Sequence, residues 1–590
     1  MPLKNLNDRI KPVKTLVLKV GNNYMHNIKI PVGRSGFADI RRNGYYYIDK
    51  SGLIEELLKT EAVQVTLITR PRRFGKTLGM NMLYEFFDIR KDSRDLFAGL
   101  SVADNKKLCK EWMNQYPVLF LSFKSIDGLD FTSAVKQLKA VFSDVCVEHY
   151  YLLGSENVNE IQKECFKLLA RKTADTDDVK NGLNLLVKML EAHYGKPVVL
   201  LIDEYDVPLA KASEKGYYNE MLDVIKGIMQ AVKDNNSLKF AVITGCLRIA
   251  KESIFTGTNN FVSDTISNTR LNEYFGFTQK ETDKLLEDTG LSLHAKETKE
   301  WYDGYLFGKF NIYCPWDVMN YVNNLLLEQS PEPKNFWENT SDNAIIRSFL
   351  DRTDFDVNDK FEVLLSGGYI KETIIESLTY DILMSSEENL WSLLYMTGYL
   401  TRVNKDEITG DILLPGQSAL KIPNVEVMDI FRKNVKAWFT EKSTKSDRRE
   451  LFTALWNEDA KKLSEIISDL LFDTISYHDY RESFYHAFIT GLVSNAGFQV
   501  ESNYENGLGR SDIVVKDRKN RRAVVIEAKW ADSEMHLEQE CINALKQIDD
   551  MQYAVKIEHL GYKKVGRLGI AFWQKKCMVK KNDTEKPVPV

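Results

Sequence analysis

The sequence lacks the features that would place a chain in a membrane or in an oxidising compartment. No apolar run approaches the roughly 20 residues that a bilayer-spanning helix needs. The opening stretch MPLKNLNDRIKPVK has no apolar core of the signal-peptide kind. The 7 cysteines are scattered and form no CxxC pair, which argues against a zinc module and a disulfide framework. We therefore expect a cytoplasmic protein without membrane association.

A strong net charge is also missing. The formal charge of -5 over 590 residues gives no global attraction to nucleic acid, so any such contact must come from local basic patches. Hydrophobic residues at 44% and charged residues at 28% are ordinary for a globular protein. One core rarely organises a chain of this length, so we expect about three or four domains.

The apolar pattern divides the chain into parts with different secondary structure. Strand-like apolar runs alternate with helical patterns at 63–69, 118–123, 197–202 and 239–244. This alternation predicts a parallel sheet covered by helices. The expected parts are an N-terminal arm (1–40), an α/β domain (41–280), a mainly helical region (281–385), a helix–hairpin–helix module of winged-helix type (386–441), a second α/β domain (450–575) and a basic tail (576–590). We expect the tail to fray.

A phosphate-binding loop is the first chemical motif. The standard loop reads G-x-x-x-x-G-K-[ST] between a strand and a helix. Gly75, Lys76 and Thr77 keep its second half, but Arg70 stands at the first glycine position. Gly75 would let the backbone approach the phosphates, Lys76 would reach the β- and γ-phosphates, and the Thr77 hydroxyl would join Mg²⁺. The 41–280 domain is therefore predicted to bind ATP.

The rest of the loop adds positive charge. Arg70, Arg72 and Arg73 precede the glycine, and we expect Arg73 and Phe74 to complete the nucleotide-binding stretch. A Gly-Lys-Thr tripeptide also occurs by chance in many proteins. The apolar strand before this one and the helix after it favour the phosphate loop.

A second apolar strand supplies the acidic half of the site. The run 197–202 ends in Asp203, which would hold Mg²⁺, and Glu204, which would orient or deprotonate the attacking water. A core strand that meets solvent at these two residues is the alternative. Thr244, at the end of the next strand, could sense the γ-phosphate or form an ordinary turn. Arg248 could act as an arginine finger, although a surface arginine is the simpler interpretation.

These motifs resemble those of the AAA-ATPase-like family found in bacteria alongside C-terminal nuclease-like domains. The resemblance covers roughly 30–345 and implies a P-loop domain of AAA/STAND type, in which the missing first glycine is a family trait. Cys314 departs from the pattern, where asparagine is expected. The matching stretches are 47–50, 70–77, 201–206, 274–278, 301–305, 307–308 and 312–316.

Near the C-terminus, an aspartate on one strand precedes a Glu-x-Lys on the next. Alternation along a strand puts Glu527 and Lys529 on one face, where Glu527 and Asp512 would bind Mg²⁺ or Mn²⁺. Lys529 would steer or activate the hydrolytic water. The pattern is that of PD-(D/E)XK nucleases, and the resemblance over about 450–575 implies accessory roles for Gln547 and Glu482. A chance Glu-x-Lys in a salt-bridged strand is the alternative.

Three functions are compatible with this organisation. The first is an ATPase coupled to a metal-dependent nuclease acting on DNA or RNA, with ATP and Mg²⁺ as cofactors and nucleic acid as partner. The second is a STAND-like signalling ATPase whose C-terminal domain binds partners without cleaving. The third is a scaffold that uses the nucleotide structurally. Self-association stays open, because AAA-like domains form rings whereas STAND-like ones can be monomers.

Overall fold

The computed structural model describes most of the chain in several stretches. These are residues 28–59, 64–248, 261–328, 331–337, 358–378, 380, 383, 385–408, 413–434, 449–474, 482–493, 498–505, 510–574 and 576–582. Residues 1–27 of the predicted arm and residues 435–448 lie outside them. Within the described residues, no helix is both long and apolar enough to span a bilayer.

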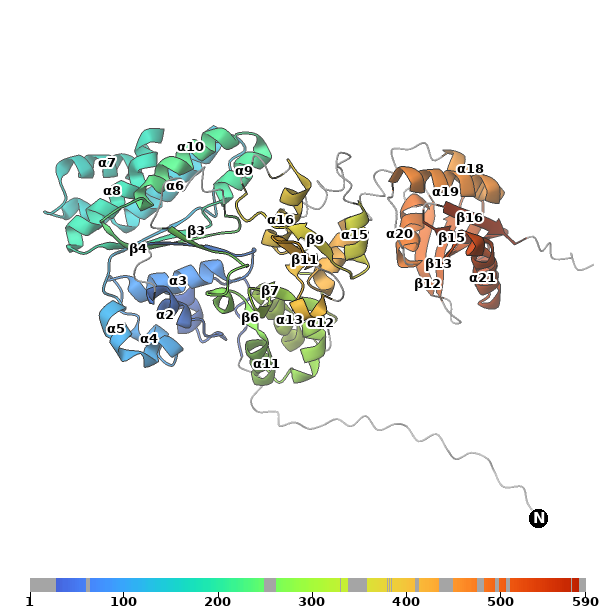
Figure 1. The fold of residues 1–590 in the computed structure, drawn as a ribbon, viewed down its shortest axis with the longest axis horizontal. Coiled ribbons are helices and arrows are strands. Elements are labelled where there is room, and N and C mark those ends of the chain that lie inside the picture. The colour runs from blue at the N-terminus through green and yellow to red at the C-terminus, as the bar shows by residue number, and fades with distance from the viewer. Residues whose placement is uncertain are drawn as a thin grey trace, which may run out of the picture.

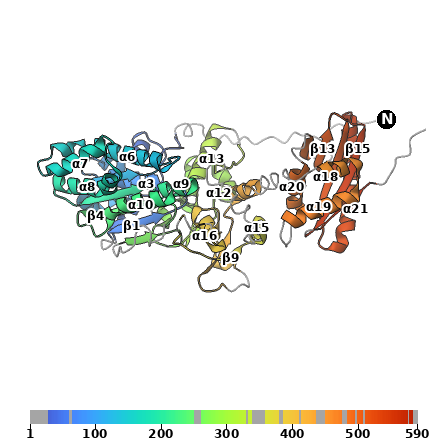
Figure 2. The ribbon, with the colours of Figure 1, turned by 90° about the horizontal axis from the view of Figure 1, so that it is seen from above.

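A five-stranded parallel sheet organises the N-terminal half (Figures 1 and 2). Its order is β2-β3-β4-β1-β5, with every neighbouring pair parallel. The strands are β1 (Val65–Thr69), β2 (Val118–Ser122), β3 (Val198–Asp203), β4 (Leu238–Gly245) and β5 (Phe261–Asp264). All residues of β1 and β3 are buried, as expected for central strands of a parallel sheet. The predicted parallel sheet is confirmed, and β5 adds an edge strand that the sequence did not indicate.

Helices cover both faces of this sheet (Figure 1). One face packs against α6 (Phe131–Glu148), α8 (Thr176–Tyr194) and α10 (Tyr218–Met229), with α7 (Glu160–Ala170) and α9 (Val207–Lys215) beside them. The other packs against α1 (Phe37–Arg42), α2 (Gly52–Leu58), α3 (Lys76–Phe87), α4 (Arg94–Phe97) and α5 (Lys106–Trp112). Alternation sends Val198 and Leu200 of β3 to the first core, and Val199 and Leu201 to the second.

Helices and two small antiparallel sheets follow. The sheet β6-β8-β7 and its helices comprise β6 (Phe277–Thr278), α11 (Gln279–Asp288), α12 (Ala295–Tyr302), β7 (Tyr305–Phe307), β8 (Phe310–Tyr313) and α13 (Pro315–Leu327). Residues 358–434, the middle module, contain α15 (Asn358–Leu365), β9 (Ile370–Thr373), α16 (Glu387–Thr397), β10 (Thr401–Arg402), β11 (Gln417–Lys421) and a helix over 425–434. The predicted order of helix, hairpin and helix is present. Its sheet, β10-β11-β9, also takes a strand from before the predicted limit of 386.

The C-terminal domain, residues 449–582, contains a mixed sheet in the order β12-β13-β14-β15-β16. Its elements are α18 (Arg449–Asn457), α19 (Ala460–Thr474), α20 (Glu482–Val493), β12 (Gln499–Glu505), β13 (Arg510–Asp517), β14 (Arg522–Trp530), α21 (Leu537–Asp550), α22 (Tyr553–His559), β15 (Lys564–Trp573) and β16 (Lys576–Lys581). Only β14 and β15 pair in parallel. Its core clusters contain no residue from the preceding domains.

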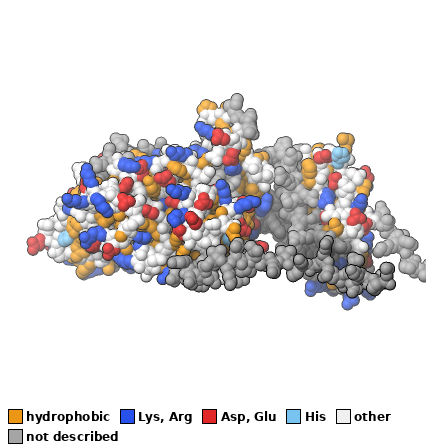
Figure 3. Space-filling model, turned by 90° about the horizontal axis from the view of Figure 1, so that it is seen from below, with side chains coloured by type: hydrophobic (Ala, Val, Ile, Leu, Met, Phe, Trp, Pro, Cys, Tyr) orange, Lys and Arg blue, Asp and Glu red, His pale blue; other side chains and the backbone are white. Residues whose placement is uncertain are grey.

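The basic tail corrects one expectation. Residues 576–581, expected to fray, form β16, which pairs antiparallel with β15. Lys576 and Lys580 form ion pairs with Glu534 and Glu538, so these lysines are partly neutralised. Over the described part of the face drawn in Figure 3, basic side chains are interspersed with acidic ones.

A buried ion pair attaches the phosphate loop to the edge of the sheet. Arg70 is 0% exposed and donates to the Asp264 carboxylate at 2.6 Å and to the Asp264 carbonyl at 2.9 Å. Its guanidinium also lies 5.3 Å from the ring centroid of Phe275. The residue at the first glycine position therefore supports the fold, and its charge is balanced by Asp264. The expectation that it adds positive charge for the phosphates is not met.

Replacing Arg70 by alanine should destabilise the N-terminal domain. Removing one partner of a buried pair leaves the other charge uncompensated, which typically costs about 3–5 kcal/mol. Urea unfolding of the full chain, followed by circular dichroism, measures this. Arg94→Ala is the matched control, since its pair with Asp92 is solvent-exposed and should not matter measurably. Equal midpoints for the two variants would contradict the structural role of Arg70.

Candidate nucleotide and nuclease sites

The phosphate loop presents an open backbone cradle. It connects β1 to α3, and Gly75 at its end has φ 85, a left-handed conformation that suits glycine. A Cβ at Gly75 would meet no atom within 4 Å, so the loop has free space at the N-terminus of α3. Backbone N–H groups and the helix dipole favour an anion there. The loop geometry therefore fits a bound phosphate chain.

Lys76 is buried, and its ammonium contacts other groups of the protein. It is 3% exposed, and its ammonium donates to the carbonyls of Arg70 at 3.0 Å and Pro71 at 3.1 Å. The Glu204 carboxylate lies 3.4 Å from it. Burial lowers the pKa of Lys76, but nearby groups outweigh burial and raise it overall. Cys246 is the largest of the groups that raise it, followed by the carboxylates of Glu204, Asp206 and Asp203.

Thr77 and Asp203 meet directly. The Thr77 hydroxyl donates to one oxygen of the Asp203 carboxylate at 2.9 Å, and the Thr244 hydroxyl donates to the other at 2.7 Å. Asp203 is fully buried, and burial raises its pKa. A hydroxyl and a carboxylate in contact are the donor set that Mg²⁺ takes in P-loop proteins. The structure thus brings together Lys76, Thr77, Asp203 and Thr244, all of which the sequence assigned to one site.

Glu204 occupies a strained position beside this group. Its φ of 55 is unusual for a residue with a side chain, and such outliers cluster at functional sites. Its N–H donates to the Thr244 hydroxyl at 3.4 Å. One carboxylate oxygen, Oε2, is buried without a hydrogen-bond partner. A buried acceptor of this kind is suited to receive a proton from a water molecule.

Arg73 and Phe74 point away from the cradle. The Arg73 guanidinium lies 5.0 Å from the Trp316 ring centroid and donates to the Phe336 carbonyl. The Phe74 ring packs against Tyr305 and Phe307, each with centroids 5.0 Å apart. In this structure both side chains anchor the loop to the region after the sheet. Their contact with nucleotide stays a prediction.

Cys314 stands at a position where asparagine is expected, and this difference changes the contacts made there. It is the N-cap residue of α13, and its side chain makes no capping hydrogen bond. Asparagine at this position commonly caps a helix. The buried thiol instead lies 3.9 Å from the Arg73 carbonyl. The position therefore contacts the phosphate loop rather than capping the helix.

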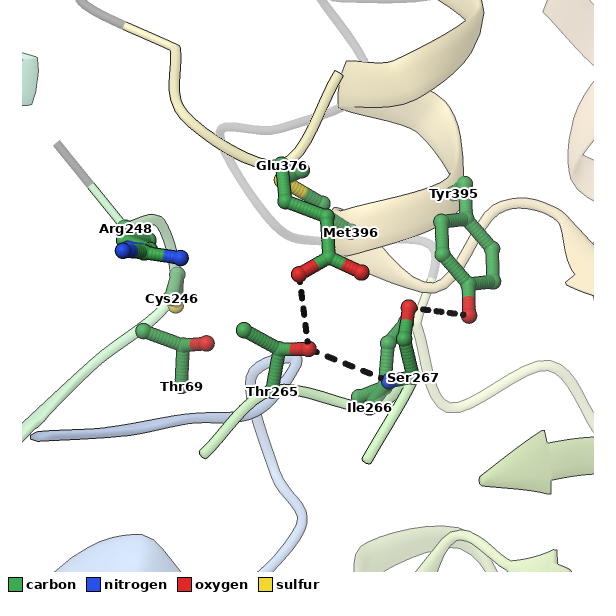
Figure 4. A pocket seen from close by; sticks show the side chains of 9 residues that line it. All are labelled: Thr69, Cys246, Arg248, Thr265, Ile266, Ser267, Glu376, Tyr395 and Met396. Carbon is green, nitrogen blue, oxygen red and sulfur yellow. Dashed lines mark hydrogen bonds between the residues drawn. The ribbon is translucent and has the colours of Figure 1, made fainter. Parts of the chain in front are cut away.

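A small pocket adjoins the nucleotide site where the sheet meets the middle module (Figure 4). The Thr265 hydroxyl donates to Glu376 at 3.2 Å, and the hydroxyls of Ser267 and Tyr395 are 3.2 Å apart. Arg248 lies in the wall across from Glu376. The lining residues are Thr69, Cys246, Arg248, Thr265, Ile266, Ser267, Glu376, Tyr395 and Met396. Arg248 therefore lies at the junction of the sheet and the middle module, and its role as an arginine finger stays a prediction.

Sequence reasoning gave no role to Asp206, although this residue belongs to a matched stretch. Asp206 is 2% exposed and contributes to the field at Lys76. The signal was present, since a third acidic residue so close to Asp203 is unusual after a buried strand. The sequence could not show that residues 246 and 247, which follow β4, lie beside Asp206, because only the fold brings them together.

In the C-terminal domain, three predicted residues meet on β14 and α21. Glu527 is 1% exposed and accepts a hydrogen bond from the Gln547 amide. The Lys529 ammonium lies 3.7 Å from the same carboxylate oxygen. The structure thus brings Glu527, Lys529 and Gln547 together, and the binding of a divalent cation there stays a prediction.

The other two predicted nuclease residues are placed by their backbone alone. Asp512 directly precedes Ile513, which pairs with Ile526, the residue before Glu527. Continuing this register by one residue would set Asp512 opposite Glu527. Glu482 is the first residue of α20. The side chains of Asp512 and Glu482 lie outside the described residues, so their roles stay predictions.

Comparison with protein families agrees with both sites. A model described as predicted AAA-ATPase matches residues 31–255, and one described as PD-(D/E)XK nuclease superfamily matches residues 480–582. The chain combines an AAA-ATPase-like domain with a PD-(D/E)XK nuclease superfamily domain. The first match contains the phosphate loop and Asp203. The second contains Glu527, Lys529 and Gln547.

A curated relative shares much of this arrangement. It is named as an uncharacterized protein in the vnfD 5' region of Azotobacter chroococcum mcd 1. The two chains are 26% identical over 410 residues, which cover 68% of this chain and 69% of the relative. The alignment is longer than the AAA-ATPase-like match, so the likeness extends beyond the phosphate-binding domain.

Gly245 allows the AAA-ATPase-like site to form, and its replacement by alanine should disturb it. A Cβ there would lie 2.6 Å from both the Asp206 carboxylate and the Tyr205 ring. Overpacking of this kind costs about 1–3 kcal/mol and would shift the end of β4. We expect a lower melting temperature and weaker binding of a fluorescent ATP analogue. Gly154→Ala, whose Cβ meets nothing within 4 Å, is the control, and matching behaviour would refute the packing argument.

Proposed function

We propose that this protein is an ATP hydrolase coupled to a metal-dependent nuclease that acts on DNA or RNA. The direct contact of Thr77 with Asp203, beside Lys76 and Glu204, supports the ATPase half. The cluster of Glu527, Lys529 and Gln547 supports the nuclease half. The first joins side chains 126 positions apart in the sequence, and the second joins neighbouring residues of β14 to α21.

In the ATPase domain each residue has a distinct task. Lys76 would exchange its loop carbonyls for the β- and γ-phosphates, and the Gly75 backbone would cradle them. Thr77 and Asp203 would hold Mg²⁺, which neutralises charge on the phosphate oxygens when bound. Glu204 would orient the attacking water and accept its proton through the unpartnered Oε2. Thr244 keeps Asp203 in place from the neighbouring strand.

In the nuclease domain the buried Glu527, together with Asp512, would hold the divalent cation. A bound Mg²⁺ or Mn²⁺ supplies a Lewis acid for the phosphodiester. Lys529 would balance the negative charge that develops on the phosphate and orient the water. Gln547 fixes the Glu527 carboxylate from α21.

A STAND-like signalling switch is the second candidate. The contacts of Glu376 and Tyr395 with Thr265 and Ser267 join the middle module to the carboxyl edge of the sheet. A nucleotide-dependent change at this junction could expose the module to a partner. Incubating the purified protein with Mg²⁺, ATP and plasmid, single-stranded DNA or RNA separates the candidates, since only a nuclease shortens the nucleic acid.

Glu204→Gln should allow ATP binding but stop hydrolysis. The amide cannot accept the proton from water, and loss of a general base lowers kcat by about 100-fold or more. Phosphate release and the affinity for an ATP analogue are measured together. Lys76→Ala should abolish nucleotide binding itself. The control is Glu160→Gln, which removes the charge of an exposed glutamate on α7 and should change neither phosphate release nor affinity. Normal turnover in Glu204→Gln would remove this residue from the mechanism.

Lys529→Ala should remove cleavage and leave ATP turnover intact. Loss of one electrostatic stabiliser of the transition state typically lowers the rate by about 100-fold or more. Cleavage of labelled DNA and RNA with Mg²⁺ or Mn²⁺ is followed beside phosphate release from ATP. Lys576→Ala, an exposed lysine of β16, is the charge-matched control. Persistent cleavage in Lys529→Ala, at the rate of Lys576→Ala, would exclude the Glu-x-Lys site.

A further inference from the structure

Asp206 is a buried carboxylate that the proposed mechanism leaves without a task. One of its oxygens, Oδ2, accepts from the N–H groups of Cys246 at 3.0 Å and Leu247 at 2.9 Å. The other, Oδ1, is buried and has no hydrogen-bond partner among the residues that the structure describes. An unpartnered buried carboxylate oxygen costs stability, so its retention calls for an explanation.

The charge of Asp206 is balanced by the nucleotide site itself. Burial and the charge of Glu204 raise the pKa of Asp206 to about 6, while the backbone N–H groups and Lys76 oppose the rise. Asp206 is therefore mostly ionised at neutral pH. Lys76 lies 3.4 Å from Glu204 and 3.6 Å from the Cys246 sulfur, whose backbone Asp206 holds. The carboxylate thus connects the ammonium of the phosphate loop with the end of β4.

The middle module reaches the same oxygen. The Tyr380 hydroxyl lies 3.5 Å from Asp206 Oδ2, a long hydrogen bond that it donates. The Tyr380 carbonyl accepts from Ser213 of α9 at 3.4 Å, and its ring lies 6.3 Å from that of Tyr218. Asp206 is therefore shared by the nucleotide site and the middle module.

We propose that Asp206 is a positioning residue for ATP turnover, which places Lys76 and the end of β4 and links them to the middle module through Tyr380. This inference rests on the proposed ATPase function. The negative charge strengthens the two hydrogen bonds from Cys246 and Leu247, because charged acceptors bind more strongly than neutral ones. The same charge repels the triphosphate. Asp206 therefore favours turnover over tight binding of nucleotide.

Asp206→Asn tests the charge separately from the shape. The amide oxygen can still accept both N–H groups, so the strand end keeps its hydrogen bonds in weaker form. We expect kcat to fall about tenfold and the Kd and KM for Mg·ATP to fall severalfold, since repulsion is removed. Tyr380→Phe keeps the charge of Asp206 and its backbone hydrogen bonds and removes only the link to the middle module, so kcat should fall by less while Kd and KM for Mg·ATP stay close to wild type.

The matched control is Asp303→Asn. Asp303 is 7% exposed, burial raises its pKa, and it too has a buried oxygen without a partner. It lies between α12 and β7, outside the proposed nucleotide machinery, and both constants should stay within about twofold of wild type. If Asp303→Asn also lowered kcat together with Kd and KM, as we expect for Asp206→Asn, the inference would be overturned.

Other outcomes also decide the matter. Unchanged constants in Asp206→Asn, or a higher KM with a lower kcat, would reduce Asp206 to a structural residue. If the wild type binds Mg·ATP without hydrolysis, the ATPase proposal fails. The inference about Asp206 is then decided by the affinity for Mg·ATP alone, and tighter binding in Asp206→Asn would support it. If the wild type binds no nucleotide, both proposals fall. If Asp206→Asn does not fold by circular dichroism, Tyr380→Phe decides, and wild-type constants in it overturn the inference.

Discussion

The hydrogen bond between Thr77 and Asp203 is the contact on which the nucleotide site depends. The two residues are 126 positions apart in the sequence, and they meet because β1 and β3 run parallel with β4 between them. Parallel strands bring their carboxyl ends to one edge, where loops from different segments converge. Thr244, from the intervening strand, donates to the same carboxylate. The site therefore depends on the order of the strands in the sheet as much as on the sequence motifs.

The electrostatics of this site describe a protein prepared for an anion. Three acidic residues, Asp203, Glu204 and Asp206, surround one buried ammonium, and two loop carbonyls complete its coordination. Burying this many charges is costly unless they compensate one another. A triphosphate with its metal would replace the internal partners of Lys76, and Mg²⁺ would take over the neutralisation of Asp203. Binding would then add a metal cation to a site in which three carboxylates lie near one ammonium.

Local patterns predicted the parts of the fold that depend on local physics. The apolar runs gave the central strands, and alternation placed Glu527 and Lys529 together, because a strand has a period of two. Tertiary partners could not be predicted in this way. The pairing of Arg70 with Asp264 spans 194 positions, and it makes an arginine of the phosphate loop a support for the edge of the sheet. Likewise β16 is rich in lysine and looks like a tail, yet it pairs with β15 and with acidic residues preceding or on α21.

The proposed coupling of ATP turnover to cleavage would follow the connections that the fold provides. The described residues of the nuclease domain share no hydrophobic cluster with those of the AAA-ATPase-like domain. The middle module does contact the ATPase sheet, through Glu376, Tyr395 and Tyr380. These hydrogen bonds lie beside apolar packing, because Leu247 and Ile266 belong to the same hydrophobic cluster as residues of the middle module. Phe74 of the phosphate loop belongs to the hydrophobic cluster that includes the middle module. Movement of this loop on phosphate binding would therefore reach the module first, and the nuclease domain only through it.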